Sequence, residues 1–253
     1  MKLALIIDDY LPNSTRVGAK MFHELAQEFI RRGHDVTVIT PDTHLQEEVS
    51  FDTFQGVKTW RFKSGPLKDV GKIQRAINET LLSHRAWNSI KSQIKRETFD
   101  GVVYYSPSIF WGSLVKKIKS RCQCPAYLIL RDMFPQWVID AGMLKAGSPI
   151  DRYFRLFERS SYRQANRIGL MSDKNLEVFR MTNKGYPCEV LRNWASLTPA
   201  VLPTGYVPLR QRLRLEDKVI FFYGGNIGHA QDMANLMRLA RNMVKHPNAH
   251  FLF

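Results

Sequence analysis

Short apolar runs rich in β-branched residues alternate with amphipathic segments of helical length along most of the chain. The first run, Leu3 to Asp8 (LALIID), is continuously apolar up to its last residue, which is typical of a strand buried on both faces. Strands that alternate with helices are typical of a parallel sheet covered by helices. We therefore expect an α/β fold with a doubly wound parallel sheet.

Periodicity and turn residues place the individual elements. The first helix is expected after Ser14, which can act as its N-cap, and should end near Gly33. A cap followed by proline at Ser148 marks another helix start. Strands are expected at 3–8, 35–40, 57–62, 101–106, 126–132, 167–172 and 188–193. Helices are expected at 73–96, 109–119, 148–164 and 174–183.

The alternation breaks at 194–217, where three prolines occur without an amphipathic period. We interpret 1–193 as one domain, 194–217 as a linker and 218–253 as one further β-α-β unit. Two strands leave one face and both edges uncovered, so 218–253 either joins the first sheet or begins a second domain. The apolar ending AHFLF favours a second domain that is truncated after its first unit.

Charge suggests an anionic partner without identifying it. The chain carries 37 Lys and Arg against 23 Asp and Glu, a net charge of +14. Nucleic acid, acidic lipid, a phosphorylated ligand or simply a solvated basic surface would each explain this excess. No zinc finger, RNP motif or recognition-type basic helix is present, so a nucleic-acid partner is not expected.

The three cysteines and seven histidines follow no zinc-binding pattern, so we expect no metal site. The N-terminal apolar run is too short for a signal peptide. No later stretch approaches the roughly 18 apolar residues of a spanning helix. These features favour a cytoplasmic protein.

Two loops carry residue types suited to phosphate. The loop DDYLPNSTRVGAKM (8–21) contains Arg16 and Gly18 and precedes a helix, whose N-terminus attracts anions. A purely structural role for this loop is an equal alternative. The segment YGGNIGHAQD (223–232) lies between an expected strand and helix. The dinucleotide, P-loop and G-x-S-x-G patterns are all absent.

Several stretches together resemble glycosyltransferase family 4, and the resemblance covers essentially the whole chain. They are LAQEFIRRGHDVTVIT (25–40), RDMFPQ (131–136), LMSDKNLEVF (170–179) and YGGNIGHAQD (223–232), with a proline-rich linker after VLRNWAS (190–196). The combination looks closest to the bacterial O-antigen transferases of the N-acetyl-L-fucosamine (WbuB-like) type. The resemblance implies the GT-B fold, with two Rossmann-like domains.

The same resemblance implies an activity. It is retaining, metal-independent transfer of a sugar, N-acetyl-L-fucosamine in that branch, from a UDP-linked donor to a saccharide on undecaprenyl diphosphate. No cofactor is implied. Absence of any D-x-D motif agrees with a donor site that uses N–H groups and cations instead of a metal. The first domain would hold mainly the acceptor and the second domain most of the nucleotide.

Site residues follow by motif position. Gly18 matches the glycine of the family's first loop, beside Arg16, while Val17 stands where many members have a second glycine. Arg131 and Asp132 occupy the place of a catalytic histidine–aspartate pair, and an arginine suits a phosphate rather than the role of an imidazole. The loop facing the donor diphosphate is matched by Gly224, Gly225, Asn226 and Gly228.

A departure from the family bears on activity. Members carry two glutamates separated by seven residues in the second domain, and no glutamates here have that spacing. We therefore expect a partial transferase that binds nucleotide sugar weakly. An inactive remnant or a basic α/β binding module is the alternative.

A lipid-linked acceptor would place the protein on the inner face of the cytoplasmic membrane. The basic segment 63–96 is a candidate for contact with anionic lipid, and the apolar connection 133–147 is a candidate for contact with lipid or sugar. The alternative is that the connection caps the core and that the helix packs on the sheet through its apolar residues Ile73, Ile77, Leu81, Leu82, Trp87 and Ile94.

Overall fold

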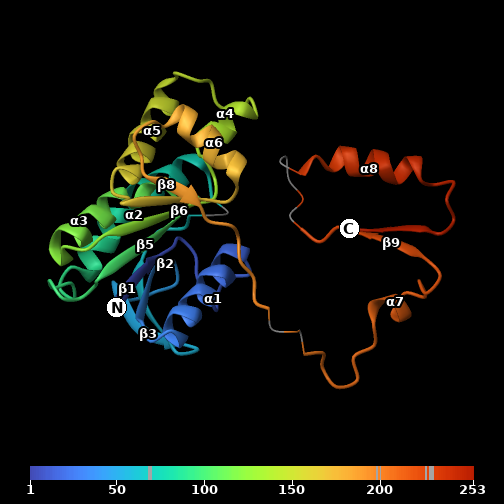
Figure 1. The fold of residues 1–253 in the computed structure, drawn as a ribbon, viewed down its shortest axis with the longest axis horizontal. Coiled ribbons are helices and arrows are strands. Elements are labelled where there is room, and N and C mark those ends of the chain that lie inside the picture. The colour runs from blue at the N-terminus through green and yellow to red at the C-terminus, as the bar shows by residue number, and fades with distance from the viewer. Residues whose placement is uncertain (68–69, 198, 200, 226, 228–230) are drawn as a thin grey trace. The chain divides into compact units, whose positions relative to one another are not determined.

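A computed structural model describes residues 1–67, 70–197, 199, 201–225, 227 and 231–253. The described residues form two compact units, Met1–Ser196 and Leu197–Phe253 (Figure 1). We call them the first and the second unit. The expected linker at 194–217 remains a prediction.

The first unit is built on an eight-stranded sheet with the order β3-β4-β2-β1-β5-β6-β7-β8. All neighbouring strands are parallel except β3 and β4. Its strands are β1 (Lys2–Ile6), β2 (Asp35–Asp42), β3 (Val49–Phe54), β4 (Val57–Lys63), β5 (Gly101–Ser106), β6 (Ala126–Leu130), β7 (Arg167–Leu170) and β8 (Cys188–Val190).

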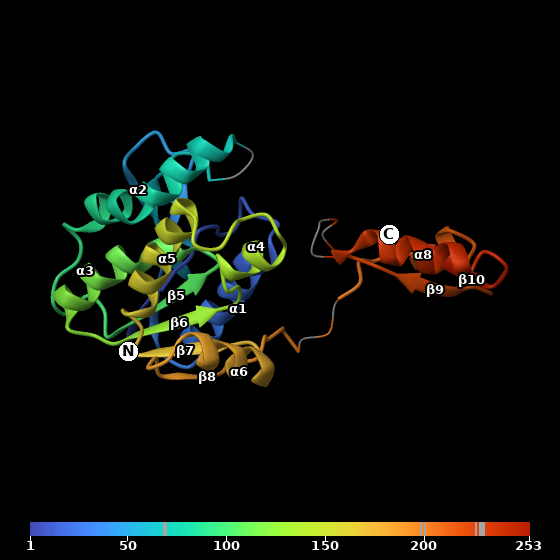
Figure 2. The same cartoon turned by 90° about the horizontal axis from the view of Figure 1, so that it is seen from above.

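Helices cover both faces of this sheet, as Figure 2 shows from above. They are α1 (Val17–Arg31), α2 (Lys72–Ile90), the 3-10 helix η1 (Ile109–Trp111), α3 (Gly112–Cys122), α4 (Gln136–Asp140), α5 (Pro149–Tyr162) and α6 (Asp173–Thr182). Phe22 of α1 belongs to one apolar cluster, while Trp111 and Tyr162 belong to the cluster on the other face. The adjacent residues Tyr104 and Tyr105 belong to different clusters, because successive side chains of a strand point to opposite faces of the sheet.

The doubly wound α/β prediction is therefore confirmed, but the sequence patterns missed β3. Val49–Phe54 is largely exposed at the sheet edge and turns into β4 through Gln55 and Gly56. Both turn residues have positive φ, +47° and +83°, as tight hairpin turns between two strands often require. A half-exposed edge strand lacks the continuous apolar run by which the buried strands were found.

Two helix predictions were also wrong in part. The helix expected to reach Arg96 ends at Ile90, and the chain then turns so that Ile94 enters the core. The expected cap Ser14 does not cap α1, which begins at Val17 with no side-chain cap. Ser14 Oγ instead donates to Asp9 Oδ2 at 2.8 Å and accepts from the N–H of Arg16.

The second unit contains α7 (Leu209–Arg212), β9 (Val219–Phe222), α8 (Met233–Asn242) and β10 (Ala249–Leu252). Strands β9 and β10 pair in parallel, and Asp232 caps α8 by accepting the N–H of Asn235. This is the expected β-α-β unit. Helix α7, which the sequence patterns did not predict, falls within 194–217. No helix in the described ranges is long and apolar enough to cross a membrane.

Gly112 marks the closest approach of α3 to α5, and its replacement by alanine should show this. An added Cβ would lie 2.8 Å from the backbone of Ser160 and Ser161. The two helices would have to separate, so Gly112→Ala is expected to lower the free energy of unfolding by about 1–3 kcal/mol. Urea denaturation measures this, with exposed Ser113→Ala as control. Equal stability of the two variants would contradict the close packing.

Candidate functional site

The candidate site lies at the carboxyl edge of the sheet. In a parallel sheet this edge gathers the loops that follow the strands and the N-termini of the next helices. The loop from β1 to α1 and the residues just after β6 both belong to this edge. Residues 16–18 and 131–132, far apart in sequence, thereby come from the ends of β1 and β6, which are separated in the sheet only by β5.

Arg131 is the most informative residue of this edge. Its Nη1 donates to Tyr105 Oη at 3.2 Å and to Met21 Sδ at 3.1 Å, and its Nε donates to Met171 Sδ at 3.4 Å. These acceptors are neutral, and thioethers are weak acceptors. No carboxylate oxygen of the described residues is within hydrogen-bonding distance of this half-buried guanidinium, although the neighbouring carboxyl of Asp132 interacts with it electrostatically. The geometry thus holds a cation in place while leaving its charge available to an anion.

Tyr105 joins Arg131 to the start of α1. A Cβ built on Gly18 would lie 3.2 Å from Tyr105 Oη, so only glycine lets the helix approach the ring without displacing it. Burial raises the pKa of the Tyr105 phenol, and the Arg131 guanidinium opposes that rise. The phenol therefore stays protonated. Gly18 and Arg131, both predicted from motifs, meet at a tyrosine that the sequence reasoning did not select.

Sequence alone offered one signal for Tyr105: it is the penultimate residue of β5, and side chains near a strand end face the loops of the carboxyl edge. Helix α1 adds a further feature, because its first turn carries no acidic residue and no side-chain cap. Its N–H groups and dipole remain directed toward this edge. They would reinforce Arg131 in attracting an anion.

Arg16 lies slightly apart from Arg131, at a cavity of about 410 Å³. Its Nε is 3.4 Å from Asp9 Oδ2, and more than half of its side chain is exposed. Opposite the first loop, the cavity is lined by the connection after β2 and by Arg61, a nearly buried arginine that donates to Leu11 O and Asp52 Oδ2. Polar groups from several loops thus surround a space of the size of a small ligand site.

A buried polar chain forms the wall behind this cavity. Tyr10 Oη lies 2.7 Å from His23 Nδ1, and His23 Nε2 lies 2.9 Å from Gln55 Oε1. Burial raises the pKa of the Tyr10 phenol, with Arg61 opposing the rise. Because Tyr10 lines the cavity and His23 is buried, the chain fixes one wall through helix α1 and the β3–β4 turn.

Asp132 differs from Arg131 in its surroundings. Its backbone carbonyl accepts a hydrogen bond from Ser106 Oγ at 3.2 Å. Although Asp132 reaches the surface, desolvation by the neighbouring protein raises the pKa of its carboxyl, and Arg131 opposes the rise. The two residues therefore share one strand end, with the guanidinium held inward. Their catalytic assignment remains a prediction.

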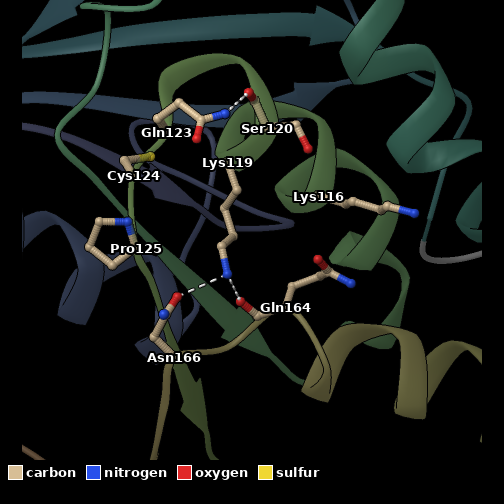
Figure 3. Close-up of a pocket in the computed structure, with 8 residues that line it drawn as sticks. All are labelled: Lys116, Lys119, Ser120, Gln123, Cys124, Pro125, Gln164 and Asn166. Atoms are coloured by element: carbon tan, nitrogen blue, oxygen red, sulfur yellow. Dashed lines mark hydrogen bonds between the residues drawn. The ribbon is translucent and has the colours of Figure 1, made fainter.

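A second cavity, of about 580 Å³, lies elsewhere (Figure 3). It sits before β6 and β7, at the amino edge of the sheet, and is lined among others by Lys119, Gln123 and Asn166. Lys119 Nζ already donates to Gln164 O at 2.5 Å and to Asn166 Oδ1 at 2.9 Å. This lysine is engaged in holding the fold, and the cavity lies on the side away from the strand ends that carry the candidate residues.

The donor-loop residues belong to the second unit. A Cβ on Gly224 would lie 2.7 Å from the Phe222 ring, and one on Gly225 would lie 3.1 Å from Tyr223 Oη, so both positions are crowded. Asn226 and Gly228, the other two predicted loop residues, lie outside the described residues. Among the described residues no three His, Cys, Asp or Glu side chains group as metal ligands. Metal independence stays a prediction.

Comparison with known proteins identifies the class to which this fold and site belong. The family model described as Glycosyltransferase Family 4 matches residues 18–181, which include the whole cluster around Arg131. The chain belongs to this family. Its narrower assignment to the N-acetyl-L-fucosamine type remains a proposal.

A curated relative and several solved structures agree with the family. WcaI of Escherichia coli (strain K12), named as a colanic acid biosynthesis glycosyl transferase, is 22% identical over 268 residues. That match spans 98% of this chain and 64% of WcaI, so the chain corresponds to less than two thirds of its relative.

Solved structures show the same fold. Sucrose-phosphate synthase from Thermosynechococcus elongatus matches with a TM-score of 0.71 at 13% identity, covering 99% of this chain and 61% of that one. The catalytic domain of Starch Synthase IV from Arabidopsis thaliana, bound to ADP and acarbose, matches with a TM-score of 0.61 at 11% identity. This match covers 100% of this chain and 68% of the synthase domain. WaaG, a glycosyltransferase involved in lipopolysaccharide biosynthesis, matches with a TM-score of 0.52 at 16% identity, and the match covers 98% of this chain and 69% of WaaG. The expected GT-B fold is confirmed.

Proposed function

We propose that the protein acts in glycosyl transfer during synthesis of a bacterial surface polysaccharide, with the first unit holding the acceptor. The donor is a UDP-linked sugar, N-acetyl-L-fucosamine by motif resemblance, and the acceptor is a saccharide on undecaprenyl diphosphate. Transfer is retaining and independent of metal. The names of WcaI and WaaG, which refer to colanic acid and lipopolysaccharide biosynthesis, support the polysaccharide assignment.

The observation that carries this proposal is the guanidinium of Arg131, held in place by neutral hydrogen-bond acceptors beside the uncapped N-terminus of α1. Departure of a nucleoside diphosphate leaves negative charge, which preorganised cations and N–H groups stabilise. The same groups suit the diphosphate of a lipid-linked acceptor. The cavity beside Arg16, with carboxylates and hydroxyl groups among its lining residues, suits the hydroxyl-rich saccharide.

The direct test is transfer by the chain itself. It is incubated with radiolabelled UDP-N-acetyl-L-fucosamine at high concentration and an undecaprenyl diphosphate-linked saccharide, with and without EDTA. A lengthened saccharide that forms equally in both samples, with retained anomeric configuration, supports the proposal. If the acceptor alone binds and no donor yields product, the chain acts as an acceptor-binding module.

Nucleotide-sugar binding should be weak in this chain. The spaced glutamate pair expected to contact sugar and ribose does not occur in its sequence. Calorimetric titration with UDP-sugars is therefore expected to give dissociation constants in the millimolar range or no detectable heat. Micromolar affinity would show that other residues replace the pair, and it would contradict this part of the proposal.

We also propose that the protein works at the inner face of the cytoplasmic membrane, where a lipid-linked acceptor would reside. The net charge of +14 favours an anionic surface. The alternative of nucleic-acid binding is tested by mobility shift with random DNA. A strong, salt-dependent shift would favour it.

A further inference from the structure

Helix α2 does not use all of its apolar residues for packing. Leu82 is fully buried, whereas Ile73 is 80% exposed and Ile77 and Leu81 are also exposed. Of the residues named in the alternative that this segment packs on the sheet, these three do not pack, whereas Leu82 and Ile94 do. They follow one another at intervals of four residues, so they form a stripe on the outer side of the helix.

Helix α5 carries a second set of exposed apolar residues next to this stripe. Ile150, Tyr153 and Leu156 are exposed, the last at 65%, and Tyr153 Oη is hydrogen-bonded to Thr80 Oγ1 of α2. The two helices thus approach each other at these residues. Both helices follow a strand and lead back to the start of the next parallel strand, so they run from the carboxyl edge of the sheet toward the amino edge. Ile77 precedes Thr80 by about one turn and Ile150 precedes Tyr153 by about one turn, so both lie nearer the carboxyl edge than the hydrogen-bonded pair.

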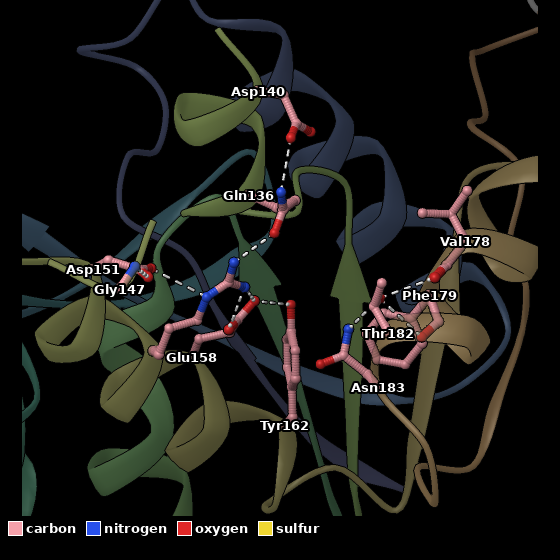
Figure 4. A network of polar contacts seen from close by, with 11 residues as sticks. Gln136, Asp140, Gly147, Asp151, Glu158, Tyr162, Val178, Phe179, Thr182 and Asn183 are labelled. Atoms are coloured by element: carbon pink, nitrogen blue, oxygen red, sulfur yellow. Dashed lines mark hydrogen bonds and ion pairs between the residues drawn. The ribbon is translucent and has the colours of Figure 1, made fainter. Parts of the chain in front are cut away.

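Helix α4 carries a further exposed apolar residue, Trp137. Arg155 of α5 binds Gln136 of α4 and pairs with the buried carboxylates Asp151 and Glu158 (Figure 4). This network fixes α4 against α5. We name the resulting surface the apolar face: it comprises Ile73, Ile77, Trp137, Ile150, Tyr153 and Leu156.

The exposed charges on the α4 and α5 part of the apolar face are predominantly basic, while on α2 Arg75 forms an ion pair with Glu79. Because Asp151 and Glu158 are buried against Arg155, they contribute no exposed negative charge. The only exposed acidic residue within 136–163, all of which the structure describes, is Asp140. The exposed basic residues of this range are Lys145, Arg152, Arg159 and Arg163.

We propose that the apolar face docks on an anionic bilayer, with these basic side chains at the lipid headgroups. Aliphatic side chains beside a tryptophan and a tyrosine, rimmed by Lys and Arg, match the chemistry of a membrane interface. Each basic residue near an anionic surface adds to binding. The inference deepens the proposed function, because it identifies a surface adjoining the edge that carries Arg131 and from which a lipid-linked acceptor would be reached.

Vesicle co-sedimentation of the full chain tests this proposal without requiring transfer. We expect binding to phosphatidylglycerol-containing vesicles, weaker binding to pure phosphatidylcholine, and loss of binding as salt screens the charges. Ile73→Glu/Leu156→Glu is expected to lower the partition coefficient about tenfold or more. Both side chains are largely exposed, so the fold should tolerate the change, which circular dichroism verifies.

The matched control is Val178→Glu/Met181→Glu. These residues are also exposed, but they lie on α6, whose last turn is at the amino edge of the sheet. The control adds the same charge and should retain vesicle binding. An equal loss of vesicle binding in both variants would overturn the proposal. It would also be overturned if the unmodified chain did not bind vesicles but self-associated with rising concentration, and if only Ile73→Glu/Leu156→Glu abolished that self-association. Since vesicles carry no sugar acceptor, absence of transfer leaves this result unaffected.

Discussion

Arg155→Ala is expected to lower the free energy of unfolding of the first unit by about 3–5 kcal/mol. The guanidinium lies 3.1 Å from the Glu158 carboxylate and 3.3 Å from that of Asp151. Glu158 is only 2% exposed, and its other partner, Tyr162 Oη, is a neutral donor. Removing the arginine would leave a buried charge uncompensated. Urea denaturation followed by circular dichroism measures the loss.

The loss should also depend on pH. Burial raises the pKa of Glu158, and Arg155 opposes this rise. A carboxyl with a raised folded pKa stabilises the folded state at low pH, and this contribution is lost as pH rises through that pKa. Without Arg155 the pKa rises further, so the deficit should be largest near neutral pH and shrink in acid. Exposed Arg152→Ala is the control. A pH-independent deficit would contradict the burial argument.

Arg131→Met should weaken binding of a diphosphate by roughly tenfold to a hundredfold, as removal of a charge-assisted hydrogen bond implies. Methionine has a similar length and is compatible with the neighbouring thioethers of Met21 and Met171. Stability should therefore change little. Calorimetric titration with pyrophosphate and with a polyprenyl diphosphate saccharide measures the effect, and the transfer rate of any product-forming reaction should fall with it.

Two further variants sharpen this experiment. Arg131→Lys keeps the charge but loses the planar fork, so it should recover only part of the affinity. Arg163→Met removes an exposed arginine of α5 and should leave diphosphate affinity unchanged. If Arg163→Met weakens binding as much as Arg131→Met, only the net charge matters and the assigned site is wrong.

The buried strands were predictable because each is a continuous apolar run, and β5 begins and ends at the residues expected. The edge strand β3 and the short helices α4 and α7 were not predicted, because exposed or very short elements lack a continuous apolar run or a clear helical period. Ser14 illustrates a different failure. Its sequence position suits a helix cap, but the side chain bonds Asp9 instead, a competition that only the folded loop decides.

For the candidate site, the sequence motifs singled out Gly18 and Arg131 but not the residue that joins them. Tyr105 lies on a third segment, and its contacts with both require the strand order β1-β5-β6. The nearly buried Arg61, by contrast, gave no signal in sequence. Its role at the cavity depends on β4 lying next to β2, which places it opposite the first loop.

Sequence by itself determined the α/β class, the family resemblance and the basic character of this protein, because these depend on local periodicity, motifs and composition. Only the tertiary structure decided which charges are compensated and which apolar residues are covered. Asp151 and Glu158 are neutralised by Arg155 while Arg131 faces neutral acceptors, and Ile73 is exposed while Leu82 is buried. Pairing and burial depend on neighbours that are distant in sequence, so local patterns do not determine them.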